Sequence, residues 1–237
     1  MGEDGGVTEP EPAPDLAAMR TSYDVARLRE QDLAATPFEQ FTSWMSDVVA
    51  AQLPEPNAMV LATSDADGVP SVRTVLLKNA DERGFTFFTN YGSRKGRALA
   101  DNPRASLLFP WHAIHRQVIV IGDVERVARD DAAAYFATRP YDSRLGAWAS
   151  AQSSVIASRE VLKARYAELA AAFPDTGSPD DVPLPDSWGG FLVRPESVEF
   201  WQGRPSRLHD RLRFVRSVAS YADLTDARAW RVERLSP

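Results

Sequence analysis

A cluster of basic and imidazole side chains near the C-terminus has the clearest capacity for chemistry. Arg207, His209 and Arg211 alternate with Leu208 and Asp210. Alternate side chains of an extended strand share a face, so the sequence predicts two guanidinium groups and an imidazole on one face. Guanidinium groups match the geometry of phosphate and carboxylate, and such a face suits an anionic ligand. Taken alone, the five residues are more typical of an exposed edge strand with solvated charges.

A second basic group, within residues 89–96, has the features of a phosphate site. Gly92 allows a tight turn, Ser93 can cap the following helix, and Arg94 and Lys95 fall in its first turn. Cations are unfavourable there because the helix dipole is positive at its N-terminus. A bound anion would remove the conflict and accept hydrogen bonds from the free N–H groups. An exposed basic helix start explains the pattern equally well, and the Walker and Rossmann glycine patterns are absent.

A third group of donors is expected on two later helices. Tyr135 and Arg139 are four residues apart and therefore share one helix face. Ser143 follows just beyond Pro140. The three side chains can gather their donors around a single phosphate.

Other polar residues give weaker signals. Arg73 and Lys78 lie five residues apart and face opposite sides of an ideal strand, so a bulge or a ligand at the strand's end must reconcile them. Gln117 is a polar residue at the start of a very apolar predicted strand, and from there it can hydrogen-bond a ligand. Gln152 and Ser153 form a polar cluster that, by itself, is more typical of a linker.

Hydrophobic spacing predicts the elements that must position these groups. A helix is expected over 36–53, with Thr36 as its cap and Pro37 in its first turn. Hairpin-linked strands suggest an antiparallel barrel. The expected strands are 59–64, 69–78, 85–89, 105–111, 116–127, 191–193, 197–201, 207–215 and 230–235. The other expected helices are 93–100, 130–138, 143–149 and 158–173.

The composition of the 237-residue chain is that of an ordinary globular protein. The absence of cysteine excludes disulfides, zinc–thiolate sites and thiol catalysis. His112 and His115 lack a third ligand in the sequence, so no metal site is expected. The net charge of −6 lies mostly in residues 1–15, and the nearly neutral remainder does not favour nucleic-acid binding.

The ends and hydropathy of the chain give further expectations. Residues 1–18 form an acidic, Pro- and Gly-rich tail that is expected to be disordered, and residues 19–237 are expected to form one domain, because strands bracket the helices. No apolar run approaches the ~20 residues of a membrane helix. No secretory signal is visible. A cytoplasmic protein with no membrane association is therefore expected.

Nine stretches in a fixed order carry a resemblance to a known family. They are RTVLLK (73–78), FFTNYGSRK (87–95), NPRASLLFPW (102–111), RQVIVIG (116–122), YFATRPYDSRLGAWAS (135–150), QSS (152–154), WGGF (188–191), EFWQG (199–203) and RLHDR (207–211). Together they resemble the pyridoxamine/pyridoxine 5′-phosphate oxidase family, over about residues 19–237. The resemblance implies an α+β, mainly β, fold: an FMN-binding split β-barrel of antiparallel strands with peripheral helices. It also implies a homodimer with FMN at the subunit interface.

The resemblance assigns roles position by position. The residues implied for FMN are Arg73, Thr74, Val75, Leu76, Leu77, Lys78, Phe88, Thr89, Arg94, Lys95, Gln117, Gln152, Ser153, Trp201 and Arg211. Those implied for the substrate are Arg20, Tyr23, Lys78, Tyr135, Arg139, Ser143, Arg207, Leu208 and His209. Arg207 and His209 are the implied catalytic residues beside the carbon that is oxidised.

The activity implied is oxidation of pyridoxamine 5′-phosphate or pyridoxine 5′-phosphate to pyridoxal 5′-phosphate, in vitamin B6 cofactor biosynthesis. A hydride leaves the substrate's 4′ carbon for the flavin, and molecular oxygen is reduced to hydrogen peroxide. Two alternatives remain at this point. One is another split-barrel flavin or deazaflavin oxidoreductase, and the other is a non-catalytic protein that binds flavin or pyridoxal phosphate.

The sequence departs from the family's pattern at three places. Phe88 stands where members often have Tyr. Arg20 and Tyr23 keep only the ends of an Arg-Arg-Glu-Tyr segment that closes over the substrate. Arg29 and Glu30 replace a basic pair linked in some members to a secondary product site.

Overall fold

The computed structural model describes residues 15–16, 19, 23 and 27–237. The expected disorder of residues 1–18 and the expected role of Arg20 fall, almost entirely, outside the described residues. Among the described residues, no helix is both long and apolar enough to cross a membrane.

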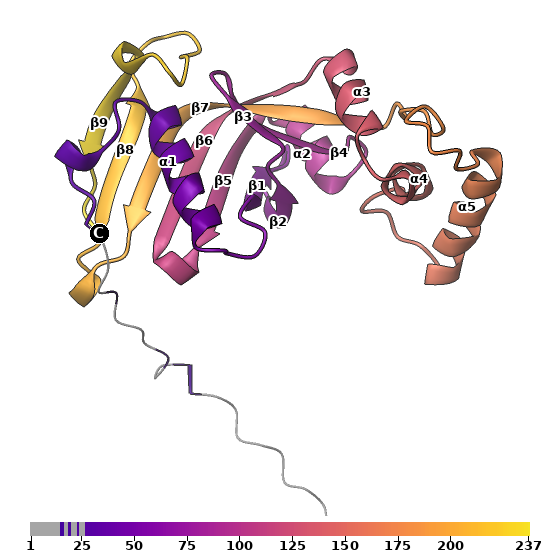
Figure 1. Cartoon of the computed structure of the whole chain (residues 1–237), viewed down its shortest axis with the longest axis horizontal. Coiled ribbons are helices and arrows are strands. Elements are labelled where there is room, and N and C mark those ends of the chain that lie inside the picture. Colours follow the sequence, from indigo (N-terminus) through magenta and orange to yellow (C-terminus); the bar gives the residue numbers. More distant parts are fainter. Residues whose placement is uncertain (1–14, 17–18, 20–22, 24–26) are drawn as a thin grey trace, which may run out of the picture.

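The centre of the fold is one antiparallel sheet, as expected for a split barrel (Figure 1). Its strands are β1 (Ala58–Ser64), β2 (Pro70–Leu76), β3 (Asn79–Asp81), β4 (Gly84–Asn90), β5 (Arg104–Trp111), β6 (Arg116–Arg126), β7 (Trp188–Gln202), β8 (Asp210–Arg216) and β9 (Trp230–Arg234). The order is β2-β1-β5-β6-β7-β4-β3, and β8 pairs with β7 and β9.

The long strand β7 divides the sheet. Its first part, 188–193, pairs with β4, whereas 197–202 pairs with β8. Because β6 occupies the opposite edge of both parts, β4 and β8 share one edge of β7 and follow each other along it. A β-bulge in the β6–β7 pairing lies between the two parts, where Gly122 faces Pro195. The sheet therefore has two ends, each with its own neighbours.

The main core lies under helix α1 (Pro37–Ala50). Thr36 caps this helix through its hydroxyl, which accepts a hydrogen bond from the Glu39 amide at 3.2 Å, as the sequence predicts. Phe41 packs edge-on against Phe85 and Phe109, with ring centroids 4.9 and 5.1 Å apart. Each fully buried large apolar side chain stabilises the fold by roughly 1.5–3 kcal/mol. The core thus fixes β4 and β5 against α1.

A second, smaller core lies among the peripheral helices, which Figure 1 shows at the end of the sheet opposite β8 and β9. The helices that build it are α3 (Arg129–Ala137), α4 (Tyr141–Ala149) and α5 (Arg159–Ala172), whereas Leu99 of α2 (Arg94–Asp101) packs into the main core. Single 3₁₀ turns are η2 (Glu30–Asp32), η3 (His112–Ile114), η4 (Pro205–Arg207) and η5 (Ala227–Ala229). Trp188, at the start of β7, belongs to this second core.

The strand predicted over 207–215 begins only at Asp210, so the prediction that Arg207, His209 and Arg211 share one strand face is wrong. Ser206 and Arg207 adopt left-handed backbone angles, with φ of 57° and 62°. These angles close the turn η4 and interrupt the extended backbone on which the alternation depends. The strands predicted over 191–193 and 197–201 are likewise one strand, β7.

Candidate active site

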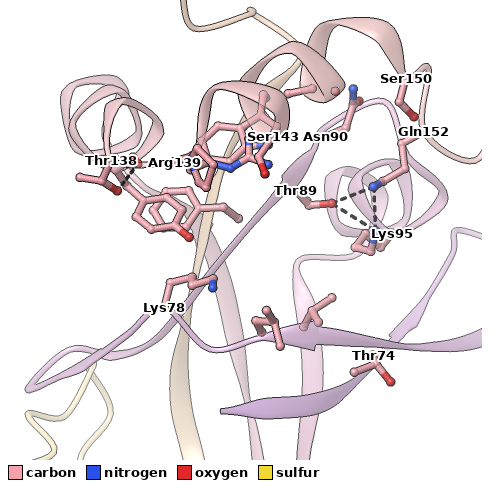
Figure 2. A pocket seen from close by; sticks show the side chains of 18 residues that line it. Thr74, Lys78, Thr89, Asn90, Lys95, Thr138, Arg139, Ser143, Ser150 and Gln152 are labelled. Carbon is pink, nitrogen blue, oxygen red and sulfur yellow. Dashed lines mark hydrogen bonds between the residues drawn. The ribbon is translucent and has the colours of Figure 1, made fainter. Parts of the chain in front are cut away.

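A cavity of about 700 Å³ opens where β2 and β4 meet the peripheral helices (Figure 2). Most of the residues implied for cofactor and substrate phosphate line it. Its lining includes Thr74, Val75, Leu76, Lys78, Phe88, Thr89, Lys95, Tyr135, Arg139, Ser143, Gln152 and Trp188. We call it the first cavity.

One side of the first cavity holds a buried ammonium group. Lys95 Nζ donates to Thr89 Oγ1 at 3.1 Å and to Gln152 Oε1 at 2.9 Å, and the Thr89 hydroxyl donates to the same Gln152 oxygen at 3.0 Å (Figure 2). All these partners are neutral, and only 8% of Lys95 is exposed. Burial, and then the charge of Arg73, lower the pKa of Lys95 below its ordinary value. An anion beside Lys95 would stabilise its charged form and so offset both burial and the repulsion from Arg73.

The first turn of α2 adds to this cationic region. Ser93 caps the helix by accepting from the Gly96 amide at 3.2 Å, and the turn carries no acidic residue. Arg73 bonds Leu61 O and Thr63 Oγ1 rather than a carboxylate. Burial, and then Arg94, lower the pKa of Arg73. Three cations and a helix N-terminus thus converge, which is the arrangement that binds a phosphate group.

A second cation lies elsewhere in the same cavity, on the side formed by α3 and α4 (Figure 2). Arg139 Nη1 is buried and has no hydrogen-bond partner. Its guanidinium lies 4.9 Å from the Trp188 ring centroid, and burial lowers its pKa. An unpaired buried donor costs about 1–3 kcal/mol, so Arg139 is ready for an anionic partner. Ser143, in the first turn of α4, and Tyr135 line the cavity beside it.

An aromatic stack forms one wall of the first cavity. Phe88 stacks on Tyr135 with centroids 4.2 Å apart and on Trp188 at 5.2 Å. The stack presents flat apolar surface to the cavity that also holds the two cationic regions. Phe88 contributes packing here that needs no hydroxyl, so the departure from Tyr leaves the wall intact.

A separate cavity of about 500 Å³ lies at the other end of β7, and we call it the second cavity. It is lined by Met19, Tyr23, His112, His115, Gln117, Trp201, Arg204, Ser206, Arg207 and His209. All three histidines of the chain are therefore gathered there. Within the described part of the chain, no group of three His, Asp or Glu residues is arranged to hold a metal ion.

The geometry of the second cavity fixes the state of His209. Its Nδ1 accepts a hydrogen bond from the Arg204 amide at 3.1 Å, so the proton of the neutral ring lies on Nε2. Burial, and then the charge of Arg207, lower the pKa of His209. His209 is therefore a neutral donor near pH 7. Its ring packs against Trp201 at 4.6 Å.

Arg207 owes its position to strained backbone. Two successive non-glycine residues in the left-handed region cost on the order of 1–3 kcal/mol each, and such strain concentrates at functional sites. The strain holds the Arg207 side chain at the second cavity without a carboxylate partner among the described residues.

Some of the implied residues line neither cavity. Arg211 forms an ion pair with Glu199 through two hydrogen bonds, at 2.7 and 3.1 Å. The pair raises the pKa of Arg211, and the carboxylate balances its positive charge. The others outside both linings are Arg73, Leu77, Arg94, Ser153 and Leu208. Sequence reasoning missed Asn90, Thr138 and Ser150 in the first cavity and Arg204 and Ser206 in the second. It considered His112 and His115 only as metal ligands.

No described residue lines both cavities. β7 carries Trp188 in the first and Trp201 in the second. Thirteen steps at ~3.3 Å correspond to roughly 40 Å of strand. A single small ligand cannot touch both cavities of one chain.

Comparisons with known proteins agree with this fold and show the family of the chain. The chain matches the family model "Pyridoxamine 5′-phosphate oxidase" over residues 45–172 and "Pyridoxine 5′-phosphate oxidase C-terminal dimerisation region" over residues 188–237. It is 54% identical over 235 residues to a pyridoxine/pyridoxamine 5′-phosphate oxidase of Streptomyces avermitilis, covering 98% of this chain and 100% of the relative. A Kineococcus radiotolerans protein of the same name is 56% identical over 94% of this chain and 99% of its own.

Two solved structures share the fold. PhzG from Burkholderia lata, in complex with tetrahydrophenazine-1-carboxylic acid, is 30% identical with a TM-score of 0.79, over 92% of this chain and all of that one. A pyridoxamine 5′-phosphate oxidase-related, FMN-binding protein from Nostoc punctiforme superposes with a TM-score of 0.65 at 17% identity, over 86% of this chain and all of that one. The second likeness speaks for the split-barrel fold alone.

Proposed function

The chain belongs to the pyridoxamine 5′-phosphate oxidase family, and on that premise we propose that it oxidises pyridoxamine or pyridoxine 5′-phosphate to pyridoxal 5′-phosphate. It is an oxidoreductase with FMN as its cofactor. Molecular oxygen is the proposed electron acceptor. One observation carries the proposal: the first cavity holds two separate cationic regions, each without an acidic partner among the described residues. Two phosphate groups, one from cofactor and one from substrate, match that arrangement.

The residues present fit FMN. Its phosphate suits the cationic region of Lys95, Arg94 and Arg73. Lys95 and Arg73 bond neutral groups, and the first turn of α2, which holds Arg94, carries no acidic residue, so the charge is uncompensated. Thr74, Val75 and Leu76 supply the adjacent wall on β2. When bound, FMN supplies the redox chemistry by accepting a hydride from the substrate's 4′ carbon and returning both electrons to oxygen as hydrogen peroxide.

The substrate phosphate is assigned to Arg139, with Lys78, Tyr135 and Ser143 around the same cavity. Arg139 Nη1 gains the partner that it lacks, and the aromatic stack of Phe88 and Tyr135 lies alongside. Binding energy from this remote phosphate orients the reacting carbon.

Arg207 and His209 are the proposed catalytic residues, and they lie in the second cavity. Because one chain's cavities are far apart, we assign each active site to the first cavity of one subunit and the second cavity of another copy. The matched dimerisation region, 188–237, contains Trp201, Arg207, His209 and Arg211. His209 offers its Nε2 proton, and Arg207 its guanidinium, to charge that develops on the substrate ring.

Mixing two impaired variants, assayed at substrate concentrations far below the KM of Arg139→Met, tests this division. Arg139→Met removes the first cavity's function and Arg207→Ala the second's. When the two are unfolded and refolded together, half of the dimers carry one intact site, so about one quarter of wild-type activity is expected to return. The variants refolded separately serve as controls. No recovery in the mixture, with dimers verified by mass spectrometry of differently tagged chains, would place the whole site in one subunit.

FMN affinity is expected to fall as the pH rises in the alkaline range. The lowered pKa of Lys95 means that its ammonium discharges at a lower pH than that of a free lysine. Binding of the phosphate needs the charged form, so the dissociation constant increases as the pH passes through this pKa and is unaffected well below it. Lys95→Arg keeps its charge throughout, and its affinity should stay level. Titrations of FMN fluorescence quenching between about pH 7 and about pH 10 check this, and parallel curves for the two proteins would refute it.

The activity itself is tested with the purified holoprotein. Pyridoxine 5′-phosphate should bleach the flavin absorbance without oxygen and release peroxide in stoichiometric amounts with it. Bound flavin that is not bleached favours a non-catalytic carrier. Bleaching by other reductants alone favours a different split-barrel oxidoreductase. A cytoplasmic location and a single folded domain over 19–237 remain predictions.

A further inference from the structure

We propose that Asp210 is a positioning residue whose carboxylate clamps the N-terminal segment and the His209 loop together at the second cavity. The inference rests on the proposed role of that cavity. Asp210 lies inside the motif at 207–211 but lines neither cavity, and nothing in the proposed reaction uses it directly.

The Asp210 carboxylate joins three parts of the chain that are distant in sequence. Oδ2 accepts a hydrogen bond from the Leu28 amide at 3.1 Å. Oδ1 accepts from Arg234 Nη1 at 3.0 Å. Oδ2 also lies 3.6 Å from Arg204 Nε. The carboxylate thus links the segment before α1, the end of β9 and the loop before η4.

Arg234 extends the clamp to the N-terminal side. Its guanidinium bonds Glu30 at 2.6 and 2.9 Å and donates to Leu28 O at 3.3 Å. The pairing raises the pKa of Arg234 and lowers that of Glu30 to about 2. Both groups are therefore charged across the physiological range, and residues 28–30 are held from two sides.

One arm of the clamp leads directly to the second cavity, and the other is connected to it along the chain. On one arm, Arg204 faces Asp210 through its side chain while its amide donates to His209 Nδ1. On the other arm, Leu28 is five residues after Tyr23, whose ring lies 4.4 Å from His115 and 5.8 Å from His209. A five-residue tether spans at most about 17 Å. Fixing Leu28 therefore limits how far Tyr23 can move from the imidazoles.

A neighbouring ion pair shows what a purely structural pair looks like. Glu233 bonds Arg213 at 2.6 Å and Arg231 at 2.9 Å, but it joins only the adjacent strands β8 and β9. Exposed pairs of this kind contribute little to stability. Asp210 differs because one of its partners, Arg204, lines the cavity that contains the proposed catalytic residues.

The test compares Asp210→Asn with the matched control Glu233→Gln in the FMN-loaded protein. An asparagine side chain has one acceptor oxygen, and its NH₂ group cannot accept a hydrogen bond. The variant therefore loses its bond either to the Leu28 amide or to Arg234, which is one arm of the clamp. We expect KM for pyridoxine 5′-phosphate to rise about tenfold, the size of one charge-assisted hydrogen bond, with FMN affinity unchanged. Glu233→Gln should stay within about twofold of wild type, since exposed pairs are worth little.

A second readout does not depend on turnover. The charged and aromatic groups around His209 are Arg204, Arg207, Tyr23, Trp201 and His115. Release of the loop exposes the ring, separates it from Arg207 and breaks the bond from the Arg204 amide, which only unprotonated Nδ1 accepts. The lost charge of Asp210 acts in the opposite direction, and we expect the net change in Asp210→Asn to be a rise in the His209 pKa. With three histidines in the chain, an NMR titration assigned with His112 and His115 variants resolves His209. Arg234→Gln, which leaves Asp210 in place, should give a smaller shift in the same direction and decides the matter if Asp210→Asn does not fold.

The outcomes separate this inference from the proposed function. Normal wild-type turnover, with KM and the His209 titration unchanged in Asp210→Asn and Arg234→Gln, overturns the clamp and leaves the function standing. An equal loss in Glu233→Gln also overturns it, because any ion pair at this edge would then suffice. A raised His209 pKa without wild-type turnover supports the clamp and removes the proposed reaction.

Discussion

Arg139→Met is expected to raise the KM for pyridoxine 5′-phosphate about a hundredfold and to leave the ligand-free protein at least as stable as the wild type. Charge-assisted hydrogen bonds are worth about 1.5–3 kcal/mol, and a bidentate contact of about 3 kcal/mol corresponds to roughly two powers of ten. Without a ligand, Arg139 Nη1 is buried and unpaired, so its removal relieves a cost. The lost contact with Trp188 offsets part of that gain.

Arg129→Met is the matched control for the stability half of this prediction. Arg129 begins α3, the helix that ends just before Arg139, but it donates to the carbonyl oxygens of Leu184, Pro185 and Trp188. Its loss should lower the melting temperature, whereas the loss of Arg139 should not. For the binding half, pyridoxine without its phosphate should be oxidised equally slowly by wild type and Arg139→Met. An equal penalty on both substrates would assign Arg139 to packing rather than to phosphate recognition.

Arg207→Ala is expected to lower kcat by about 10²–10³-fold, the range seen when one preorganised donor to developing charge is removed. FMN content should not change, because the cationic region proposed for the cofactor phosphate lies in the first cavity. Steady-state peroxide release and the flavin absorbance of the purified variant measure the two quantities. Arg231→Ala, which removes an exposed guanidinium paired with Glu233, should leave both near wild type.

The strained backbone supplies a further check on Arg207. Glycine adopts the left-handed region freely, whereas alanine does so at a cost of about 1–2 kcal/mol. Arg207→Gly should therefore be more stable than Arg207→Ala, with the same loss of kcat. Near-normal turnover in either variant would show that the guanidinium takes no part in the reaction.

The sequence predicted what depends on local pattern. The cap at Thr36 and the alternating strands β1 and β5 follow from residue type and spacing alone. The prediction that Arg207 and His209 share a strand face was wrong. The left-handed backbone angles at Ser206 and Arg207 occur at non-glycine residues, so nothing in the sequence indicated them. The separation of the two cavities depends on β7 changing partners from β4 to β8, which is a property of long-range pairing. The bond from Arg204 to His209 is also formed only by the folded loop.

β7 has a consequence for how this protein can change over generations. On each side of the β-bulge its side chains alternate between faces, so the loss or gain of one residue reverses the orientation of the side chains that follow. Such an indel before the bulge at Pro195 would turn Trp201 away from its cavity while leaving Trp188 in place. The number of residues in β7 thus sets which side chains face the first cavity and which face the second. New substrate preferences can arise through substitutions in the loops and helices at either end. A change in the length of β7, by contrast, would disturb one of the two cavities.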